Sequence, residues 1–306
     1  MLSGYSKSEF LPFFSKYGHY VFAIIVVGVS VSFFVQLLID KTKRRSSKGS
    51  QLYSANKSLE LAPDEEFAEN EEETKEEEDG PYLPRDLKHV KYVYARPSVD
   101  EMIVKSAEFY AIANARRTLR FFSSEPVPRQ VVRNIVKAAG TAPSGAHTEP
   151  WTFCVVSNDE LKRQIREIVE REEEINYKKR MGKRWTADLK PLRTDWHKDY
   201  LTEAPYLILA FKQEYGRLPN GGKKIHYYKD MSVAIACGIL ITAIQYCGLV
   251  TLTSTPLNCG PALRQLLGRP ANEKLALLLP IGYPAAEATV PDLQRKQLND
   301  ILVEFE

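Results

Sequence analysis

The sequence predicts one folded domain of mixed helices and strands, preceded by a single transmembrane helix. Residues 20–39 form an uncharged, largely apolar run of twenty residues, which is the length of a helix that crosses the hydrocarbon core of a bilayer. Residues 205–211 and 275–281 are almost continuously apolar, as is typical of buried strands. Residues 128–140 carry apolar side chains at helical spacing, which predicts an amphipathic helix.

Composition narrows the class of protein. The 306 residues have a net charge of only +3, and the basic residues are spread through the chain, so nucleic acid is not an expected partner. The five histidines show no metal-ligand spacing such as HExxH, so no metal site is expected. The four cysteines form no CxxC pair and have apolar or small neighbours, which favours reduced core thiols over disulfides. They are Cys154, Cys237, Cys247 and Cys259.

The basic residues that flank the apolar run predict its orientation. Because positively charged flanks stay on the cytoplasmic side of a membrane, the bulk of the chain is expected in the cytoplasm. A cleavable signal peptide is the alternative, but no small-x-small cleavage site follows the run. The flanking residues are Lys41, Lys43, Arg44, Arg45 and Lys48 after the run, and Lys7 and Lys16 before it.

A charged linker separates the membrane helix from the folded domain. Between Glu60 and Asp79, twelve of twenty residues are acidic, a composition that cannot bury enough apolar surface to fold. We expect a solvated tether, with an acidic interaction surface as the alternative. The predicted organisation is an N-terminal segment at 1–19, a membrane helix at 20–39, a basic then acidic linker at 40–80, and a catalytic domain at 81–306.

Hydrophobic spacing and turn residues predict the elements of the folded domain. Asp159 is expected to cap a helix, and Gly140 to end the one before it. The helix at 230–248 is apolar nearly all round, which predicts a central position or a subunit interface. In order, we expect an extended arm at 82–97, a helix at 99–115, the entry to a strand at 116–122, a helix at 128–140, a strand at 151–156, a helix from 159, a strand at 205–211, a turn at 220–222, a helix at 230–248, strands at 249–253 and 275–281, and a C-terminal arm beyond 282.

Two stretches have the residue types of an anion or cofactor site. Residues 141–151 (TAPSGAHTEPW) contain Gly and Pro, which leave backbone amides free to face a ligand. An ordinary loop is the alternative. In 116–122 the chain alternates so that Arg116, Thr118 and Arg120 project to one side, an arrangement that suits a phosphate. A solvated basic edge strand is the alternative there.

The charged segment 171–185 is a candidate lid. On a helix, Glu173 and Tyr177 lie on one face, and Lys198 follows further along. A solvated charged helix is one interpretation, and a mobile lid that closes polar groups over a zwitterion is the other. Three hydroxyls at the end of the strand at 249–253 can hydrogen-bond a heterocycle, although surface Thr and Ser are as common there. They belong to Thr253, Ser254 and Thr255.

Familiar catalytic motifs are missing from the sequence. No GxGxxG follows a predicted strand, and no GxxxxGK[ST] occurs. His147 has no Ser or Cys nucleophile motif near it, so a hydrolytic triad is not supported. Any chemistry is therefore expected to come from a bound cofactor, and a protein without catalytic chemistry is the alternative.

The motifs TAPSGAHTEPWTF, EEEINYKKRMGKRW, TPLNCGP and EATVPDL resemble the nitroreductase superfamily, over about residues 99–297. The resemblance implies an α+β, nitroreductase-like FMN-binding fold that forms an intertwined homodimer, with FMN held at the subunit interface by residues of both chains. It implies that reducing equivalents come from NADPH through a separate reductase. The residues that match FMN-binding positions are Arg116, Arg117, Thr118, Leu119, Arg120, Ser144, Thr253, Ser254, Thr255 and Arg295.

The resemblance also assigns a substrate and roles. Glu173 matches the residue that binds an amino acid ammonium, Lys198 its carboxylate, and Tyr177 completes the set. The amide of Ala146 matches the group that receives a phenolate, and Thr255 the hydroxyl that contacts flavin N5. The implied reaction is reductive dehalogenation of 3-iodotyrosine and 3,5-diiodotyrosine to tyrosine and halide.

Two rival functions stay open at this point. A general nitroreductase of the same fold acts on nitroaromatics or quinones and has no need of residues that bind a zwitterion. A non-catalytic membrane protein that binds flavin or halotyrosine is the rival from another class.

Overall fold

A computed structural model describes residues 83–306 of the chain. The compact unit that contains them spans Gly80–Glu306, and Met1–Asp79 forms a separate unit. The predicted membrane helix at 20–39 and the linker at 40–80 therefore lie outside the described residues.

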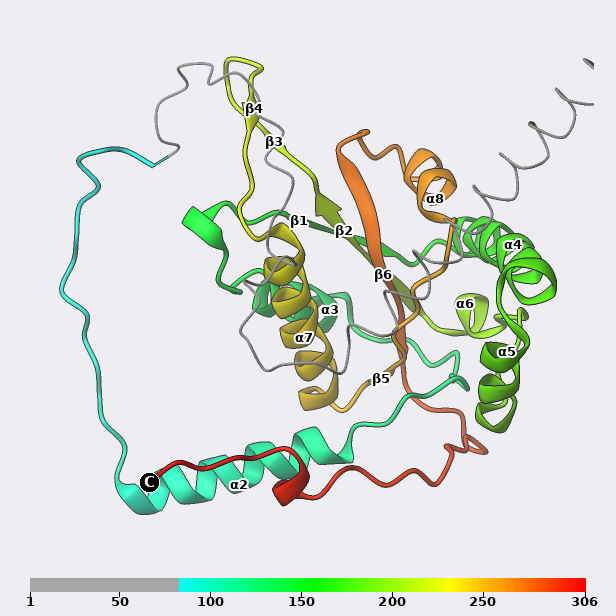
Figure 1. Cartoon of the computed structure of the whole chain (residues 1–306), viewed down its shortest axis with the longest axis horizontal. Helices are drawn as coiled ribbons and strands as arrows, with labels where there is room; N and C mark the ends of the chain where they lie inside the picture. Colours follow the sequence, from blue (N-terminus) through cyan, green and yellow to red (C-terminus); the bar gives the residue numbers. More distant parts are fainter. Residues whose placement is uncertain (1–82) are drawn as a thin grey trace, which may run out of the picture. The chain divides into compact units, whose positions relative to one another are not determined.

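The domain is built on a four-stranded antiparallel sheet (Figure 1). The strands follow the order β1-β2-β6-β5, so β2 and β6 are central and β1 and β5 form the edges. Their bounds are Trp151–Val156 for β1, Tyr206–Gln213 for β2, Val250–Thr251 for β5 and Glu273–Gly282 for β6. The predicted strands at 151–156, 205–211 and 275–281 are confirmed. The strand predicted at 249–253 is only two residues long. Further along the chain, Ser254 pairs with Leu278 only as an isolated bridge.

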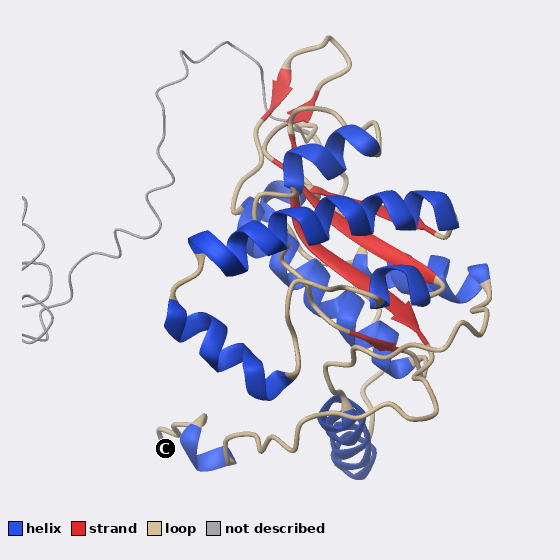
Figure 2. Cartoon of the chain, turned by 90° about the vertical axis from the view of Figure 1, so that its right-hand side faces the viewer, coloured by secondary structure: helices blue, strands red, loops and turns tan. Residues whose placement is uncertain are grey.

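Helices cover both faces of the sheet (Figure 2). Leu207, Leu209 and Phe211 of β2 pack with one helical layer, and Ile208 between them packs with the other, as the alternation of strand side chains requires. The first layer contains α4 (Asp159–Ile175), α6 (Tyr200–Glu203) and α8 (Gly260–Leu266), and the second contains α3 (Arg129–Ala139) and α7 (Lys229–Tyr246). This mixed arrangement confirms the α+β class.

Two helix starts show what the local sequence encodes. The helix predicted at 99–115 is α2 (Val99–Ala115), and Ser98 and Glu101 form a reciprocal capping box at its start. The helix at 159 begins as predicted, but the prediction that Asp159 caps it was wrong. The side chain of Asn158 accepts the hydrogen bond from the Leu161 amide at 2.9 Å, because the cap is the last residue before helical backbone begins.

Helix α7 is apolar enough to cross a membrane, and it is the one helix among residues 83–306 that passes this test. Its inner side is buried against α3 and the sheet, with Val233, Ala236 and Leu240 nearly inaccessible. Ile235 and Tyr246 on the same helix stay exposed. Helix α7 is thus buried on one side only, so the prediction that it is buried all round was wrong, and its outer apolar side chains face solvent.

The prediction of a strand at 116–122 was wrong. The segment is extended, but it pairs with the sheet only through isolated bridges from Thr118 to Thr251 and from Phe122 to Pro284. The neighbouring β5 offers only two residues of ladder, which is too short to pair with a regular strand. The segment nonetheless lies along the β5 edge of the sheet.

Several remaining elements were not predicted individually. Beyond α4, the chain forms a π-turn and two short helices, and a small hairpin surrounds the predicted turn at 220–222. The bounds are Asn176–Arg180 for η4, Lys183–Leu189 for α5, Lys190–Leu192 for η5, Gly216–Arg217 for β3 and Lys223–Lys224 for β4. All four cysteines are free, and Cys237 and Cys259 are buried. Cys247 is exposed at the end of α7, so its predicted core position was wrong.

Candidate functional site

The three residues predicted to bind a zwitterion converge in the structure. Glu173 ends the buried side of α4, Tyr177 lies in η4, and Lys198 precedes α6. Glu173 and Lys198 are only 8% and 6% exposed, and their Oε2 and Nζ atoms are 3.8 Å apart. The ammonium of Lys198 lies 5.5 Å from the centre of the Tyr177 ring. We call these residues the charged trio, and residues 171–200 the lid.

Burial and neighbouring charge shift the pKa values of Lys198 and Tyr177. The pKa of Lys198 is lowered, mainly because burial disfavours its ammonium, although the carboxylate of Glu173 opposes this effect. The pKa of Tyr177 is raised by burial and by Glu173. The lid therefore keeps charged groups in a partly dry environment, where electrostatic interactions are stronger than in water.

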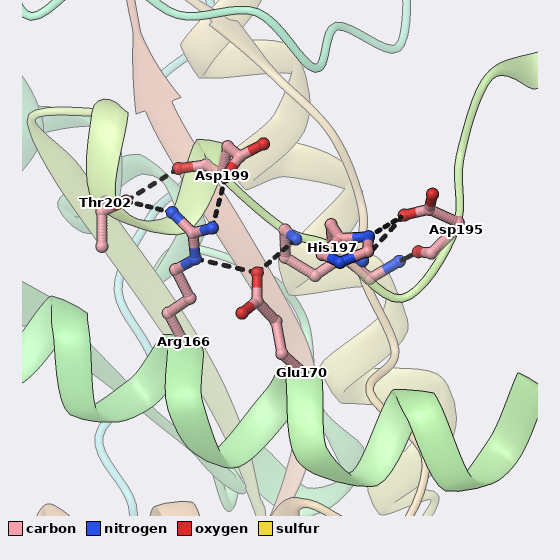
Figure 3. Close-up of polar contacts among 7 residues, drawn as sticks. Arg166, Glu170, Asp195, His197, Asp199 and Thr202 are labelled. Carbon is pink, nitrogen blue, oxygen red and sulfur yellow. Dashed lines mark hydrogen bonds and ion pairs between the residues drawn. The ribbon is translucent and has the colours of Figure 1, made fainter.

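A second set of residues holds the segment that carries Lys198 against α4 (Figure 3). The Lys198 amide donates to Glu170 Oε1 at 2.7 Å, and Arg166 Nε donates to the same oxygen at 2.8 Å. Arg166 also donates to Thr202 Oγ1 at 2.9 Å and pairs with Asp199. Lys198 Nζ donates to the carbonyl of Asp195. Sequence reasoning missed Glu170 and Arg166, although their i,i+4 spacing of opposite charges was a visible signal.

Arginines gather where the extended segment 116–120 meets the C-terminal arm. Arg295 donates to the carbonyl of Asn114 at 2.8 Å and to that of Arg116 at 2.6 Å, and Arg117 donates to the carbonyl of Pro291. None of Arg116, Arg117, Arg120 and Arg295 forms an ion pair with a carboxylate of residues 83–306. Guanidiniums without a carboxylate partner favour an anionic ligand.

Leu119 differs from its neighbours in this segment. Its side chain is buried and its amide donates to the Thr251 carbonyl at 3.2 Å, so it fixes the segment on the sheet. Thr118 and Arg120 line a cavity of about 250 Å³ together with Arg193 of the lid and Thr289 of the arm.

The three predicted hydroxyls point in different directions. Ser254 is held to β6 by two backbone hydrogen bonds with Leu278, of 3.0 and 2.8 Å, and its side chain is hydrogen-bonded to the buried Tyr200, whose pKa is raised by burial. Thr253 and Thr255 are exposed on either side of it. A ligand at this edge can therefore contact the two threonine hydroxyls, while Ser254 supports the segment from within.

The loop at 141–150 has strained backbone and a free amide. Ala146, His147 and Glu149 have φ values of 48°, 54° and 49°, which non-glycine residues seldom adopt. Ser144 Oγ accepts a hydrogen bond from the Glu149 amide at 3.0 Å. Within residues 83–306, the amide of Ala146 donates no hydrogen bond, so it remains available to an acceptor on a ligand.

Glycine is required at position 145 by its neighbours. A Cβ atom at Gly145 would lie 2.8 Å from both Cβ and O of Tyr227, which is closer than atoms can approach. The loop at 141–150 thus packs directly against the segment that starts α7.

One chain brings most predicted site residues together but not all. The charge of Arg120 acts on Tyr177 and Lys198, which places segment 116–120 near the lid. The loop at 141–150 precedes β1, at the opposite edge of the sheet from β5, and it packs on the side of α7 rather than α4. Within one chain, the loop at 141–150 and the lid therefore lie on opposite sides of the sheet (Figure 1).

No group of three or more His, Cys, Asp or Glu side chains in residues 83–306 is arranged to hold a metal ion. Apart from the Glu173 carboxylate, the polar groups of the site are guanidiniums, hydroxyls, an ammonium and the free amide of Ala146. These are donors, and they suit an anionic organic ligand better than a cation.

Comparisons with known proteins agree with this donor set. The model of the nitroreductase family matches residues 113–283. The chain is 60% identical over 235 residues to an iodotyrosine deiodinase of Danio rerio, covering 77% of this chain and 78% of that protein. It is 51% identical over 284 residues to an iodotyrosine deiodinase of Daphnia pulex, covering 92% and 95%. A crystal structure of oxidized iodotyrosine deiodinase bound to FMN and 3-iodo-L-tyrosine has a TM-score of 0.56 and 31% identity, covering 65% of this chain and 98% of that one.

Proposed function

Since the chain belongs to the nitroreductase family and, within it, to the iodotyrosine deiodinases, we propose that it removes iodide reductively from 3-iodotyrosine and 3,5-diiodotyrosine. FMN is the cofactor, and tyrosine and iodide are the products. The observation that carries this function is the buried charged trio, because a carboxylate and an ammonium 3.8 Å apart under a lid match the two charges of an amino acid.

The geometry of the trio explains how a zwitterion is bound. Lys198 donates a hydrogen bond to the Asp195 carbonyl, whereas its Nζ atom stays 3.8 Å from Glu173 Oε2. Glu173 and Lys198 can therefore each pair with a charged group of the substrate instead of with each other. A substrate ammonium next to Glu173 and a substrate carboxylate next to Lys198 complete a ring of alternating charges. Charge-assisted hydrogen bonds of this kind are stronger when water is excluded, which is the role of the lid.

The phenol end of the substrate needs a different partner. The free amide of Ala146 can donate to the phenolate oxygen, as backbone amides do in oxyanion holes. The ionised ring is then fixed at both ends, by the amide and by the charged trio. The geometry of one chain keeps these two ends apart, and this separation supports a site completed by a second chain.

The residues at the β5 edge fit FMN. Arg116, Arg117 and Arg295 offer guanidiniums without carboxylate partners to its phosphate, and Thr253 and Thr255 offer exposed hydroxyls to its ring. When bound, FMN supplies the two electrons that, with one proton, replace the carbon–iodine bond by a carbon–hydrogen bond and release iodide. The chain itself binds and orients the substrate and excludes water.

The separation of the site residues supports an intertwined homodimer. In such a dimer, Ser144 and Ala146 of one copy face the lid of the other. An apolar groove of about 680 Å³ between α2, α3 and α7 is lined by residues such as Phe109, Ile235 and Ile239, and no residue of α2 is buried. A second copy of this chain is the occupant that covers the groove and brings the two halves of the site together.

The anchor and its orientation rest on the sequence. The uncharged run at 20–39 and the basic residues that follow it support a single-pass membrane protein with its catalytic domain on the cytoplasmic side. The acidic linker extends the tether between membrane and domain. The proposed electron donor is a separate reductase that draws on NADPH, as the resemblance to the family implies.

Iodide release tests the proposed function. The full-length chain in detergent, loaded with FMN and reduced anaerobically with dithionite, should convert 3-iodotyrosine into equal amounts of tyrosine and iodide. A yellow protein that reduces nitroaromatics but leaves 3-iodotyrosine intact would instead be a general nitroreductase. Binding of 3-iodotyrosine without any turnover would identify a non-catalytic binding protein.

A further inference from the structure

The lid contains one polar side chain that is fully shielded from water and has no role in the function described so far. Asn176 is 0% exposed and lies in the π-turn η4, three residues after Glu173. Burying an amide is unfavourable unless its donors and acceptor are satisfied. A π-turn interrupts regular helical hydrogen bonding, and such turns often mark functional sites.

The amide of Asn176 uses both of its functional groups. Its Nδ2 donates to Glu173 Oε1 at 3.0 Å and to the carbonyl of Leu257 at 3.1 Å. Its Oδ1 accepts from Arg180 Nη1 at 2.9 Å. One side chain therefore connects the carboxylate of the charged trio, the segment just after Thr255, and the outer surface of the lid.

These contacts fix the orientation of the Glu173 carboxylate. Because Asn176 occupies Oε1, only Oε2 is left to face Lys198 and an incoming ammonium. The donor is neutral, so it restrains the carboxylate without cancelling its charge. A cationic donor at this position would instead compete with the substrate ammonium for Glu173.

We propose that Asn176 is the positioning residue that makes the site selective for the α-ammonium of its substrate. It does so by aiming Glu173 Oε2 and by joining the lid to the segment that carries Thr253 and Thr255. The inference rests on the proposed function, because it deepens the account of how the same site binds halotyrosines.

A pair of substrates separates this role from a purely structural one. 3-Iodotyrosine carries the α-ammonium, and 3-(4-hydroxy-3-iodophenyl)propionate lacks it but keeps the carboxylate and the iodophenol. The full-length, FMN-loaded chain is titrated with each compound, and Kd is read from quenching of the flavin fluorescence. Thermal unfolding of each variant is recorded in parallel.

Asn176→Asp keeps the acceptor for Arg180 but replaces both donors with a second carboxylate beside Glu173. A hydrogen bond to a charged group is lost, so the Kd for 3-iodotyrosine should rise roughly 10- to 100-fold. The Kd of the deamino compound should change less than about twofold, since it makes no contact with Glu173.

A milder variant covers the case in which Asn176→Asp does not fold. Arg180 is exposed, and Arg180→Met removes the donor to Asn176 Oδ1 together with the ion pair that Arg180 forms with Glu172. It should weaken 3-iodotyrosine binding roughly threefold to tenfold, as the loss of one hydrogen bond predicts. Lys179→Met is the matched control, because Lys179 is an exposed lid cation that contacts no part of the site, and both Kd values should stay at wild type.

The outcomes separate the inference from the proposed function. Equal losses for both compounds, or no loss for 3-iodotyrosine in either Asn176→Asp or Arg180→Met, would overturn the role of Asn176. A wild-type chain that binds the two compounds equally would show that no ammonium selectivity exists to be positioned. A wild type that binds 3-iodotyrosine selectively but releases no iodide would overturn only the proposed reaction.

Discussion

The two helix-covered faces of the sheet differ in which side chains they leave without partners inside the chain. On the side of α4, polar groups find partners within the chain, as when Arg166, Glu170 and Asp199 hold the segment that carries Lys198. On the side of α7, the chain leaves apolar side chains such as Ile235 and Phe109 uncovered. On the α4 face these polar groups are paired within the chain, whereas the α7 face leaves apolar side chains exposed.

This difference assigns separate tasks to the two faces. The α4 face contains the charged trio and the residues that hold Lys198 in place. The α7 face contains the loop with Ala146 and an exposed apolar groove of about 680 Å³. Each prediction below changes one of the faces and states which property should follow.

The largest effect is expected on the α7 face. Ile235→Arg places an unpaired charge in the proposed dimer interface, where burial costs several kcal/mol. The dimer should dissociate, FMN should be lost, and iodide release at nanomolar protein should fall by about 100-fold or more. Mass by light scattering and flavin absorbance check this. Ile225→Arg is the control, because Ile225 is exposed on the hairpin side of the domain and lines no groove. A dimeric, active Ile235→Arg variant would show that the second copy does not cover this face.

The next effect belongs to the α4 face. Glu173→Gln removes the charge that faces the substrate ammonium and keeps the shape of the side chain. KM for 3-iodotyrosine should rise about 100-fold with FMN still bound, because hydrogen bonds between charged groups contribute about 1.5–3 kcal/mol. Steady-state iodide release and flavin absorbance check this. An unchanged KM would remove the charged trio from the binding site.

A smaller effect follows from the lowered pKa of Lys198. Between this pKa and the ordinary value of 10.5, the unfolded chain binds a proton that the folded chain has lost, so Lys198 adds stability as pH rises. Binding changes in the opposite direction, because the ammonium that binds the substrate carboxylate disappears. KM should therefore rise severalfold between pH 7 and pH 9.5.

The diiodinated deamino analogue, 3-(4-hydroxy-3,5-diiodophenyl)propionate, isolates the titration of Lys198. It has no ammonium, and its phenol ionises readily. Lys198→Arg keeps its charge throughout the range, so its KM should stay nearly constant with pH. Parallel rises in the wild type and Lys198→Arg would assign the titration to another group.

Sequence reasoning predicted elements whose signal is local. The apolar runs of β1, β2 and β6 and the helix at 99–115 follow from composition and capping over a few neighbouring residues. The segment at 116–122 failed because its pairing depends on the length of β5, which lies far along the chain. Hydrophobic periodicity disappears after Arg171, so nothing local indicated the π-turn.

The site was predictable residue by residue only through resemblance to a family. The ring of contacts around Lys198 joins residues 28 to 36 positions apart, and spacing alone does not indicate such pairs. The separation of Ala146 from Glu173 depends on strand order and on which face each helix covers. Neither property is encoded in a motif, so the separation of the two parts of the site is visible only in the fold.

The smallest effect concerns the start of α4 and leaves both functional faces intact. Asn158 accepts the capping hydrogen bond, so Asn158→Ala should lower the free energy of unfolding by about 1 kcal/mol. For a domain of this size the unfolding temperature should fall by roughly 2–4 °C. The side chain of Asp159 forms an ion pair with Lys162 but is almost fully exposed. Asp159→Ala should therefore lower the free energy of unfolding by less than about 0.5 kcal/mol. Calorimetry of the two variants measures the difference, and KM for 3-iodotyrosine should be unchanged in both. If Asp159→Ala were the more damaging change, the first turn of α4 would depend on its negative charge next to the helix N-terminus rather than on the cap.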